Sequence, residues 1–279
     1  MSETIGIIDR GVGGLGLFKK LREVSNRPII YFADNGNAPY GLIEKSRLKH
    51  RLDHIINTLN KQGASKVVLA CNSASVVYPD SDDVKGIIQF GVSSLLKAQA
   101  TKPALIATRG TVESAAYSTL FQQQGLSVIE HIAQPLAIHV EQGNINGRRL
   151  EQDALHIMRP LAACDAILMA CTHFPAIKPL LQRYIHPDCQ LIDPVDEMSL
   201  WIEQNWPHSR GCHPPNRTQF LITGADKQLI QSAKISFGVD IDPTTVLSLK
   251  NEFAACKINY SAASDRVLNS PNWRPFSSC

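Results

Sequence analysis

The sequence carries little net charge and contains no Cys-x-x-Cys pair. Its 28 basic and 25 acidic side chains leave a formal net charge of +3, and the basic residues are scattered along the chain. This excess is too small to indicate a nucleic acid or an anionic membrane as a partner. The seven cysteines are odd in number, and none forms a Cys-x-x-Cys pair. Cys171-Thr172-His173 could ligate a metal, but the sequence offers no second cluster of Cys and His at ligand spacing. We therefore expect reduced thiols, with neither disulfides nor a zinc site.

The amino terminus lacks the features of a signal peptide and of a membrane span. It contains an acid, Glu3, and only a short apolar run that ends at Asp9. A membrane-spanning helix needs about 20 apolar residues. We therefore expect a cytoplasmic protein with no membrane partner. A chain of 279 residues, 44% of them hydrophobic, is long enough for two medium-sized domains, each with its own buried core.

Apolar runs alternate with amphipathic stretches through most of the sequence. We expect strands at residues 4–9, 28–33, 66–70, 103–107, 126–130, 165–169, 217–223 and 245–249. Helices are expected at residues 15–24, 44–62, 111–124 and 148–162, and after Asp226. Strands that alternate with helices are typical of a doubly wound α/β fold with a parallel sheet.

The order of these elements restarts near Ala100. Residues 7–11 align with 106–110, and Ala70-Cys71 aligns with Ala170-Cys171. The repeat predicts two similar doubly wound α/β domains with mostly parallel sheets, related by pseudo-symmetry, with the active site in the cleft between them. We expect a linker-like stretch at 207–215. The expected units are residues 1–95 plus 211–255 for the first domain, 96–210 for the second, and 256–279 for a C-terminal tail.

Two cysteines occupy matched positions in this repeat. Cys71 and Cys171 each end an apolar run and begin a polar turn, which places both sulfurs at the carboxyl edge of a sheet. A helix that begins after Cys71 would lower the pKa of its thiol, and the same amides, with Asn72 and Ser73, could hold a carboxylate. His173 can exchange a proton with Cys171. Either cysteine alone suits a buried structural role, but the repeat favours a pair of active thiols.

A glycine-rich turn follows the first expected strand and allows other interpretations. Residues 11–16 read Gly-Val-Gly-Gly-Leu-Gly, and Asp34 ends the next strand where a ribose-binding acid would lie in a dinucleotide fold. The charged pair Asp9-Arg10 at the start of the turn argues against a pyrophosphate site. A tight strand-to-helix turn that binds no ligand is a further interpretation of the same residues.

These stretches resemble the glutamate racemases of the pyridoxal-independent aspartate/glutamate racemase family. The resemblance extends over about residues 4 to 250 and rests mainly on the paired cysteine motifs. The matching stretches are residues 9–14, 31–34, 39–41, 70–75, 108–114, 140–143, 171–175 and 223–224.

The resemblance implies racemisation of glutamate or aspartate without pyridoxal, metal or nicotinamide, in a homodimer that supplies D-glutamate for peptidoglycan. One cysteine would remove the α-proton as a thiolate, and the other would deliver a proton to the opposite face. By this resemblance Asp9 assists Cys71, His173 assists Cys171, and Glu141 is an auxiliary acid. The substrate-binding residues implied are Pro39, Tyr40, Gly41, Asn72, Ser73, Thr111 and Thr172. We add Arg10 to them from its own chemistry, because a guanidinium can bind a carboxylate by two hydrogen bonds.

The sequence departs from the family pattern at two places. Arg10 stands where the family has Ser, and residues 35–38 differ from a loop that carries Thr and a basic residue. The guanidinium could pair with Asp9 or bind a substrate carboxylate. Arg10 therefore motivates an alternative function, a racemase-like amino-acid-binding or regulatory protein in which catalysis is altered or lost.

Overall fold

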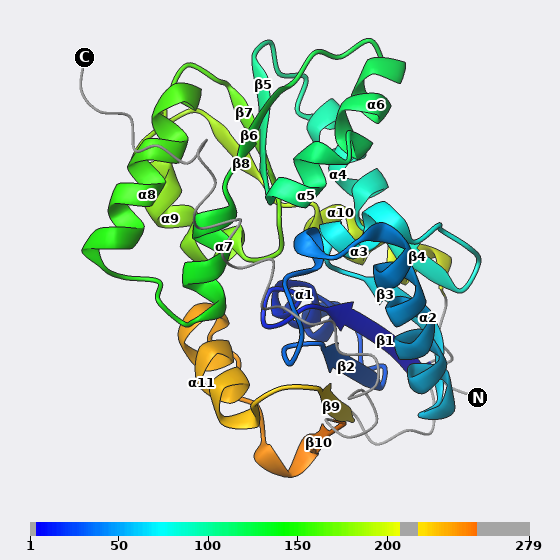
Figure 1. Ribbon diagram of the computed structural model, residues 1–279. Coiled ribbons are helices and arrows are strands. Elements are labelled where there is room, and N and C mark those ends of the chain that lie inside the picture. The colour runs from blue at the N-terminus through cyan, green and yellow to red at the C-terminus, as the bar shows by residue number, and fades with distance from the viewer. Residues whose placement is uncertain (1–3, 207–216, 250–279) are drawn as a thin grey trace.

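Two parallel sheets form the centre of the computed structural model, which describes residues 4–206 and 217–249 (Figure 1). One sheet has six strands in the order β10-β9-β2-β1-β3-β4, and the other has four in the order β6-β5-β7-β8. Neighbouring strands run parallel throughout both sheets. The predicted α/β class with two mostly parallel sheets is confirmed. The linker predicted at 207–215 and the tail at 256–279 lie outside the described residues.

The strands are β1 Thr4–Asp9, β2 Ile29–Ala33, β3 Ala64–Leu69, β4 Val84–Gly86, β5 Pro103–Ala107, β6 Ile129–Ile132, β7 Ala166–Ala170, β8 Gln190–Ile192, β9 Thr218–Ile222 and β10 Val246–Ser248. The α-helices are α1 Leu15–Val24, α2 Lys45–Lys61, α3 Asn72–Val77, α4 Ile88–Lys97, α5 Arg109–Glu113, α6 Ala116–Gln123, α7 Gln134–Glu141, α8 Arg148–Met158, α9 Lys178–Gln182, α10 Val195–Asn205 and α11 Asp226–Phe237. The short 3-10 helices are η1 Tyr40–Leu42, η2 Arg159–Leu161, η3 Phe174–Ile177 and η4 Pro243–Thr245. Within the described ranges, none of these helices has the length and apolar character needed to span a membrane.

The central strands are apolar throughout because both faces of each sheet are buried. In β1, Ile7 packs into a core that also contains residues of the four-stranded sheet, whereas Ile8 packs on the opposite face against α2. In β7, Met169 joins the shared core and Leu168 packs on the other face with residues of α4 and α6. One hydrophobic cluster therefore connects the two sheets.

The four strands β2-β1-β3-β4 have the same order in their sheet as β6-β5-β7-β8 have in theirs. Cys71 follows β3 and Cys171 follows β7, so the two thiols leave corresponding strands. This is the arrangement that the sequence repeat predicts. Figure 1 shows the six-stranded sheet in the lower half of the view and the four-stranded sheet in the upper half.

Two helices pack across the expected domain division. α4, which extends past the expected boundary at residue 95 to Lys97, packs against β7 of the four-stranded sheet. α10, expected in the second domain, packs against α1 beside the six-stranded sheet. The division at residues 95 and 210 remains a prediction.

The helix predicted at 111–124 is wrong in its extent, because it is divided into α5 and α6. Ala115 adopts a left-handed conformation (φ 57°), and the Ser114 hydroxyl accepts a hydrogen bond from the Ala116 amide at the start of α6. The strand predicted to begin at Leu126 begins at Ile129 instead. The Leu126 amide donates to the carbonyl of Phe121 and so still belongs to the end of α6.

A buried ionic cluster fixes the loop that follows β2. The Asp34 carboxylate, fully buried, accepts hydrogen bonds from Arg51 of α2, from the Tyr40 hydroxyl (2.9 Å) and from the Thr223 hydroxyl (2.7 Å). The Arg51 guanidinium is 2% exposed. One carboxylate thus connects α2, η1 and the end of β9.

Replacing Asp34 should destabilise the fold strongly. Asp34→Ala removes the carboxylate that neutralises a buried guanidinium, and we expect a loss of about 3–5 kcal/mol in the free energy of unfolding, measured in urea. The matched control is Asp240→Ala, in the exposed pair with Lys234. That change should cost less than about 1 kcal/mol. Equal losses in the two variants would contradict the assigned role of Asp34.

Candidate active site

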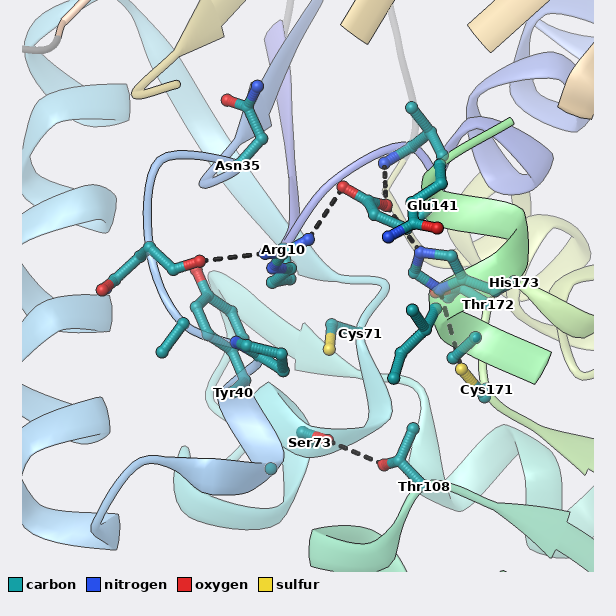
Figure 2. A pocket seen from close by; sticks show the side chains of 18 of the residues that line it. Arg10, Asn35, Tyr40, Cys71, Ser73, Thr108, Glu141, Cys171, Thr172 and His173 are labelled. Atoms are coloured by element: carbon teal, nitrogen blue, oxygen red, sulfur yellow. Dashed lines mark hydrogen bonds and ion pairs between the residues drawn. The ribbon is translucent and has the colours of Figure 1, made fainter. Parts of the chain in front are cut away.

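The carboxyl ends of strands from both sheets converge on one cavity of about 800 Å³. Asp9 ends β1, Cys71 follows β3, Thr108 follows β5 and Cys171 follows β7. Because parallel strands end at the same edge of a sheet, polar residues that follow them gather there. Figure 2 shows both cysteines at this cavity, with His173 between Cys171 and Glu141.

The structure brings the predicted site residues together. Those that line the cavity are Arg10, Pro39, Tyr40, Gly41, Cys71, Asn72, Ser73, Glu141, Cys171, Thr172 and His173. Asp9 and Thr111 do not line it, and both are buried. Thr111 still contacts the hydroxyl of Ser73 (3.4 Å), and Asp9 contacts that of Thr172 (3.1 Å). Their catalytic and binding roles remain predictions.

Cys171 lies at one end of a chain of titratable groups. Its Sγ is 3.7 Å from Nδ1 of His173, whose Nε2 is 2.7 Å from Oε2 of Glu141. Burial lowers the pKa of His173, but hydrogen bonds to Cys171 and Glu141 outweigh burial and raise that pKa well above its ordinary value. The imidazole is therefore positioned to hold a proton beside Cys171.

Glu141 is the shared acceptor of this group. Its carboxylate accepts hydrogen bonds from Nη1 of Arg10 (2.9 Å), from the Val12 amide (3.1 Å) and from His173. Burial raises the pKa of Glu141, yet His173 and Arg10 lower it further, so the net direction is downward. Glu141 is therefore held as a carboxylate.

The glycine-rich turn makes room for these groups. A Cβ on Gly11 would lie 2.0 Å from Oε1 of Glu141, and a Cβ on Gly13 would lie 2.2 Å from the Thr172 hydroxyl and 2.7 Å from Nδ1 of His173. The turn is thus filled by protein side chains. Asp34 is fully buried and bound by Arg51, Tyr40 and Thr223, so it offers no carboxylate to a ribose. Both findings disfavour the dinucleotide interpretation.

Asp9 is fully buried and does not line the cavity. Its carboxylate accepts hydrogen bonds from the Gly11 amide (2.9 Å) and the Thr172 hydroxyl (3.1 Å). Burial raises the pKa of Asp9, although His173 and the Gly11 amide oppose the rise. Asp9 thus connects the turn after β1 to the loop that carries Cys171.

Cys71 is more strongly protonated than the sequence suggests. The predicted helix begins at Asn72, and the amides of Ala74 and Ser73 do lower the thiol pKa. Burial and the charge of Asp9 nevertheless outweigh them and raise the pKa well above its ordinary value. The expectation of a lowered pKa is wrong, because burial was not visible in the sequence. In the resting protein Cys71 is a thiol.

A cluster of amide and hydroxyl groups surrounds the start of α3. The Tyr117 hydroxyl donates to Oδ1 of Asn72 (2.7 Å), which leaves Nδ2 of Asn72 buried and, within the described residues, without an acceptor. The hydroxyls of Ser73, Thr108 and Thr111 lie within 3.4 Å of one another. This arrangement presents uncharged donors to a carboxylate in the cavity.

Arg10 pairs with Glu141 rather than with Asp9, as judged from the described residues. Its Nη2 also donates to the Asn37 carbonyl (3.0 Å). The two departures from the family pattern, Arg10 and the 35–38 loop, are therefore in direct contact. The Tyr40 hydroxyl, in contrast, donates to Asp34 rather than to a group in the cavity that Tyr40 lines.

Several cavity residues were missed in the sequence. Thr108 and Gln134 follow strand ends, as the cysteines do, and that signal would have identified them. Gln228 of α11 has no such signal, because only tertiary packing brings it to the cavity. The same holds for Tyr117 of α6, which does not line the cavity but donates a hydrogen bond to Asn72. In the part of the chain that is described, no group of three or more His, Cys, Asp and Glu side chains is arranged to hold a metal ion.

The pair of His173 and Glu141 should make stability depend on pH at both ends. The raised pKa of His173 stabilises the fold fully below about pH 6.5, and this contribution is lost as pH rises through the folded pKa. The lowered pKa of Glu141 stabilises it above about pH 4.5, and this contribution is lost as pH falls through the folded pKa.

Glu141→Gln should therefore lower the pKa of His173, since burial would be opposed by fewer interactions. The measurement is an NMR titration of ¹⁵N-labelled histidine in the wild type and the variant. Glu113→Gln, which removes an exposed partner of Arg109, is the matched control and should leave His173 unchanged. An unaltered His173 titration in Glu141→Gln would show that this carboxylate does not hold the proton.

The chain is similar to proteins of one family over most of its length. The family model described as Asp/Glu/Hydantoin racemase matches residues 20–198. Glutamate racemase from Pseudomonas entomophila is 34% identical over 211 residues, which cover 69% of this chain and 77% of the relative.

Solved structures agree with this similarity. The glutamate racemase of Thermus thermophilus, in complex with beta-chloro-D-alanine, superimposes with a TM-score of 0.78 at 25% identity and covers 90% of this chain and 98% of its own. That of Campylobacter jejuni gives a TM-score of 0.76 at 25% identity over 86% of this chain and 100% of its own. From its sequence match and its fold, the chain belongs to the Asp/Glu/hydantoin racemase family.

Proposed function

We propose that this protein inverts the α-carbon of an acidic amino acid, with glutamate as the first substrate to test, by proton transfer between Cys71 and Cys171. The observation that carries the proposal is the placement of the thiols. They follow corresponding strands of two sheets and line one cavity, each near its own acid or base. Glutamate is chosen because the similar proteins are named glutamate racemases.

The chemistry requires a base on one face of the α-carbon and an acid on the other. In one direction, the Cys171 thiolate removes the α-proton, and the Cys71 thiol donates its proton to the opposite face of the carbanion. Cys71 ends as the thiolate and Cys171 as the thiol. This state is the one required by the product enantiomer, so the reverse reaction exchanges the two roles.

The neighbours of each thiol suit these roles. His173 can take the Cys171 proton and, as an imidazolium, stabilise the thiolate, while Glu141 holds the imidazole in place. Burial and the Asp9 charge keep Cys71 protonated until it acts as the acid. Asp9 is the group that would assist Cys71 when the roles exchange. Its carboxylate also accepts a hydrogen bond from Thr172, in the loop that carries Cys171.

The substrate would be held by polar residues of the cavity. Asn72, Ser73 and Thr172, which line the cavity, would bind the α-carboxylate and the ammonium group, and Thr111 would act behind them through its contact with the Ser73 hydroxyl. Arg10, beside Glu141, also lines the cavity, as does the Pro39-Tyr40-Gly41 segment, in which Gly41 lies close to Ser73. No cofactor is part of this proposal.

One observation favours a second candidate, an amino-acid-binding or regulatory protein. Arg10 lies in the cavity and pairs with Glu141, so it also influences the proton chain to Cys171. If this pairing suppresses proton transfer, glutamate would bind without exchange of its α-hydrogen. Calorimetry together with exchange in D₂O separates the two functions.

Each thiol should be essential for racemisation. Cys71→Ala and Cys171→Ala should each lower the rate of conversion of L-glutamate by a factor of at least about 10²–10⁴. The rate is followed by circular dichroism and by deuterium entry at the α-carbon. Cys164→Ala, at a buried cysteine outside the cavity, is the control and should retain activity. Wild-type turnover in both active-site variants would contradict the two-cysteine mechanism.

The physiological proposal is that the enzyme acts as a cytoplasmic homodimer and supplies D-glutamate for peptidoglycan. We expect the wild-type gene, but not a Cys71→Ala variant, to restore growth of a bacterial strain that requires added D-glutamate. Failure of the wild type, when it is expressed and folded, would argue against this physiological role.

A further inference from the structure

We infer that Arg10 binds the side-chain carboxylate of the substrate and thereby selects dicarboxylic amino acids over their uncharged analogues. This inference rests on the proposed function, because it assigns one end of the same substrate. It depends on three features of Arg10. Some of its N–H donors have no acceptor, it shares the Glu141 carboxylate with His173, and its position is fixed by hydrogen bonds.

The Arg10 guanidinium has more N–H donors than the surrounding protein groups have acceptors for them. Of its five N–H groups, one on Nη1 donates to Glu141 and one on Nη2 donates to the Asn37 carbonyl. Nε is buried and has no acceptor among the described residues. An unsatisfied buried donor is unfavourable, and a carboxylate is the ligand that satisfies a guanidinium by two parallel hydrogen bonds.

The charges at the cavity leave Arg10 incompletely neutralised. Glu141 is the carboxylate that Arg10 contacts, and it is also the partner of His173, whose pKa is raised. Arg10 therefore shares the Glu141 carboxylate with His173, which also contacts Cys171. Asp9 lies behind the wall and accepts from Gly11 and Thr172. A second anion in the cavity would balance the charge beside Arg10.

Arg10 is held from both halves of the molecule. Glu141 comes from α7, beside the four-stranded sheet, and Asn37 comes from the loop after β2 of the six-stranded sheet. That loop is itself fixed, since Asn35 accepts from the Gly224 amide (2.9 Å) and donates to the Ala225 carbonyl (3.1 Å). A side chain fixed in this way loses little conformational entropy when it binds a ligand.

The position of Arg10 relative to the other polar cluster fits a substrate with two carboxylates. Figure 2 shows Arg10 in the middle of the view, with Ser73 and Thr108 below it and Cys71 between these levels. Asn72 and the hydroxyl cluster offer uncharged donors to one carboxylate, and Arg10 offers a cation to the other. The α-carbon would then lie in the region of the thiols.

The test uses two ligands that carry no α-amino group and cannot be racemised. Glutarate has both carboxylates, whereas its monoamide replaces one of them with an uncharged amide of similar size. Calorimetry on the full-length protein should show that the wild type prefers glutarate by roughly 10- to 100-fold, as expected for charge-assisted hydrogen bonds. Arg10→Met should abolish this preference, and Arg183→Gln, in the exposed pair with Glu151, should retain it.

The comparison of two ligands separates a direct contact from an effect through Glu141. A change that acts only through Glu141 and His173 would alter the affinities for both ligands by the same factor. A preference for glutarate that persists in Arg10→Met would overturn the inference. An equal loss of affinity for both ligands in that variant would also overturn it.

A second measurement does not depend on the folding of Arg10→Met. In the ¹⁵N-arginine spectrum of the wild type, the Nε–H resonance of Arg10, assigned by its loss in Arg10→Lys, should shift with glutarate and not with the monoamide. No shift at saturating glutarate would overturn the inference. Exchange of the α-hydrogen of glutamate is measured separately. Its absence would contradict the proposed function, while an Arg10-dependent preference for glutarate would still support this binding site.

Discussion

The carboxylate of Glu141 is the interaction on which the arrangement of the site depends. It receives Arg10 and the Val12 amide from the segment after β1, and His173 from the loop after β7. It therefore connects the carboxyl ends of both sheets at the point where they face the cavity. Without this negative charge, His173 would lose one of the two hydrogen bonds that raise its pKa against burial, and Arg10 would lose its ionic partner. The Glu141 carboxylate thus fixes both the hydrogen-bonded chain through His173 to Cys171 and the position of Arg10.

This dependence explains a motif that would otherwise suggest a different ligand. Glycines after a first strand commonly allow a pyrophosphate to approach the backbone. Here the same absence of side chains admits Glu141 at Gly11, and Thr172 and His173 at Gly13. The glycines in the sequence indicate only that another group lies close to the backbone of the turn, whether a ligand or a protein side chain. The structure shows that the close groups belong to the protein.

Sequence patterns predicted those parts of the molecule that depend on local chemistry. The strands β1 and β7 were predictable because burial of both faces makes them continuously apolar, and Cys71 and Cys171 were predictable because polar residues follow such runs. The break at Ala115 depends on a single left-handed residue and was not predictable from periodicity. The pKa of Cys71 was predicted in the wrong direction, since it is determined by burial and by Asp9, which is 62 positions away in the sequence.

The two departures from the family pattern are best understood as one feature. A guanidinium at position 10 needs acceptors, and the loop after β2 supplies the Asn37 carbonyl while Asn35 and Gly36 hold that loop against the end of β9. These contacts, one of them to the main-chain carbonyl of Asn37, give Arg10 a supporting structure. Without these acceptors, a partly buried guanidinium at position 10 would have unmet hydrogen bonds, which is costly. The supporting loop therefore favours a role for Arg10 in binding over a chance substitution that the site merely tolerates.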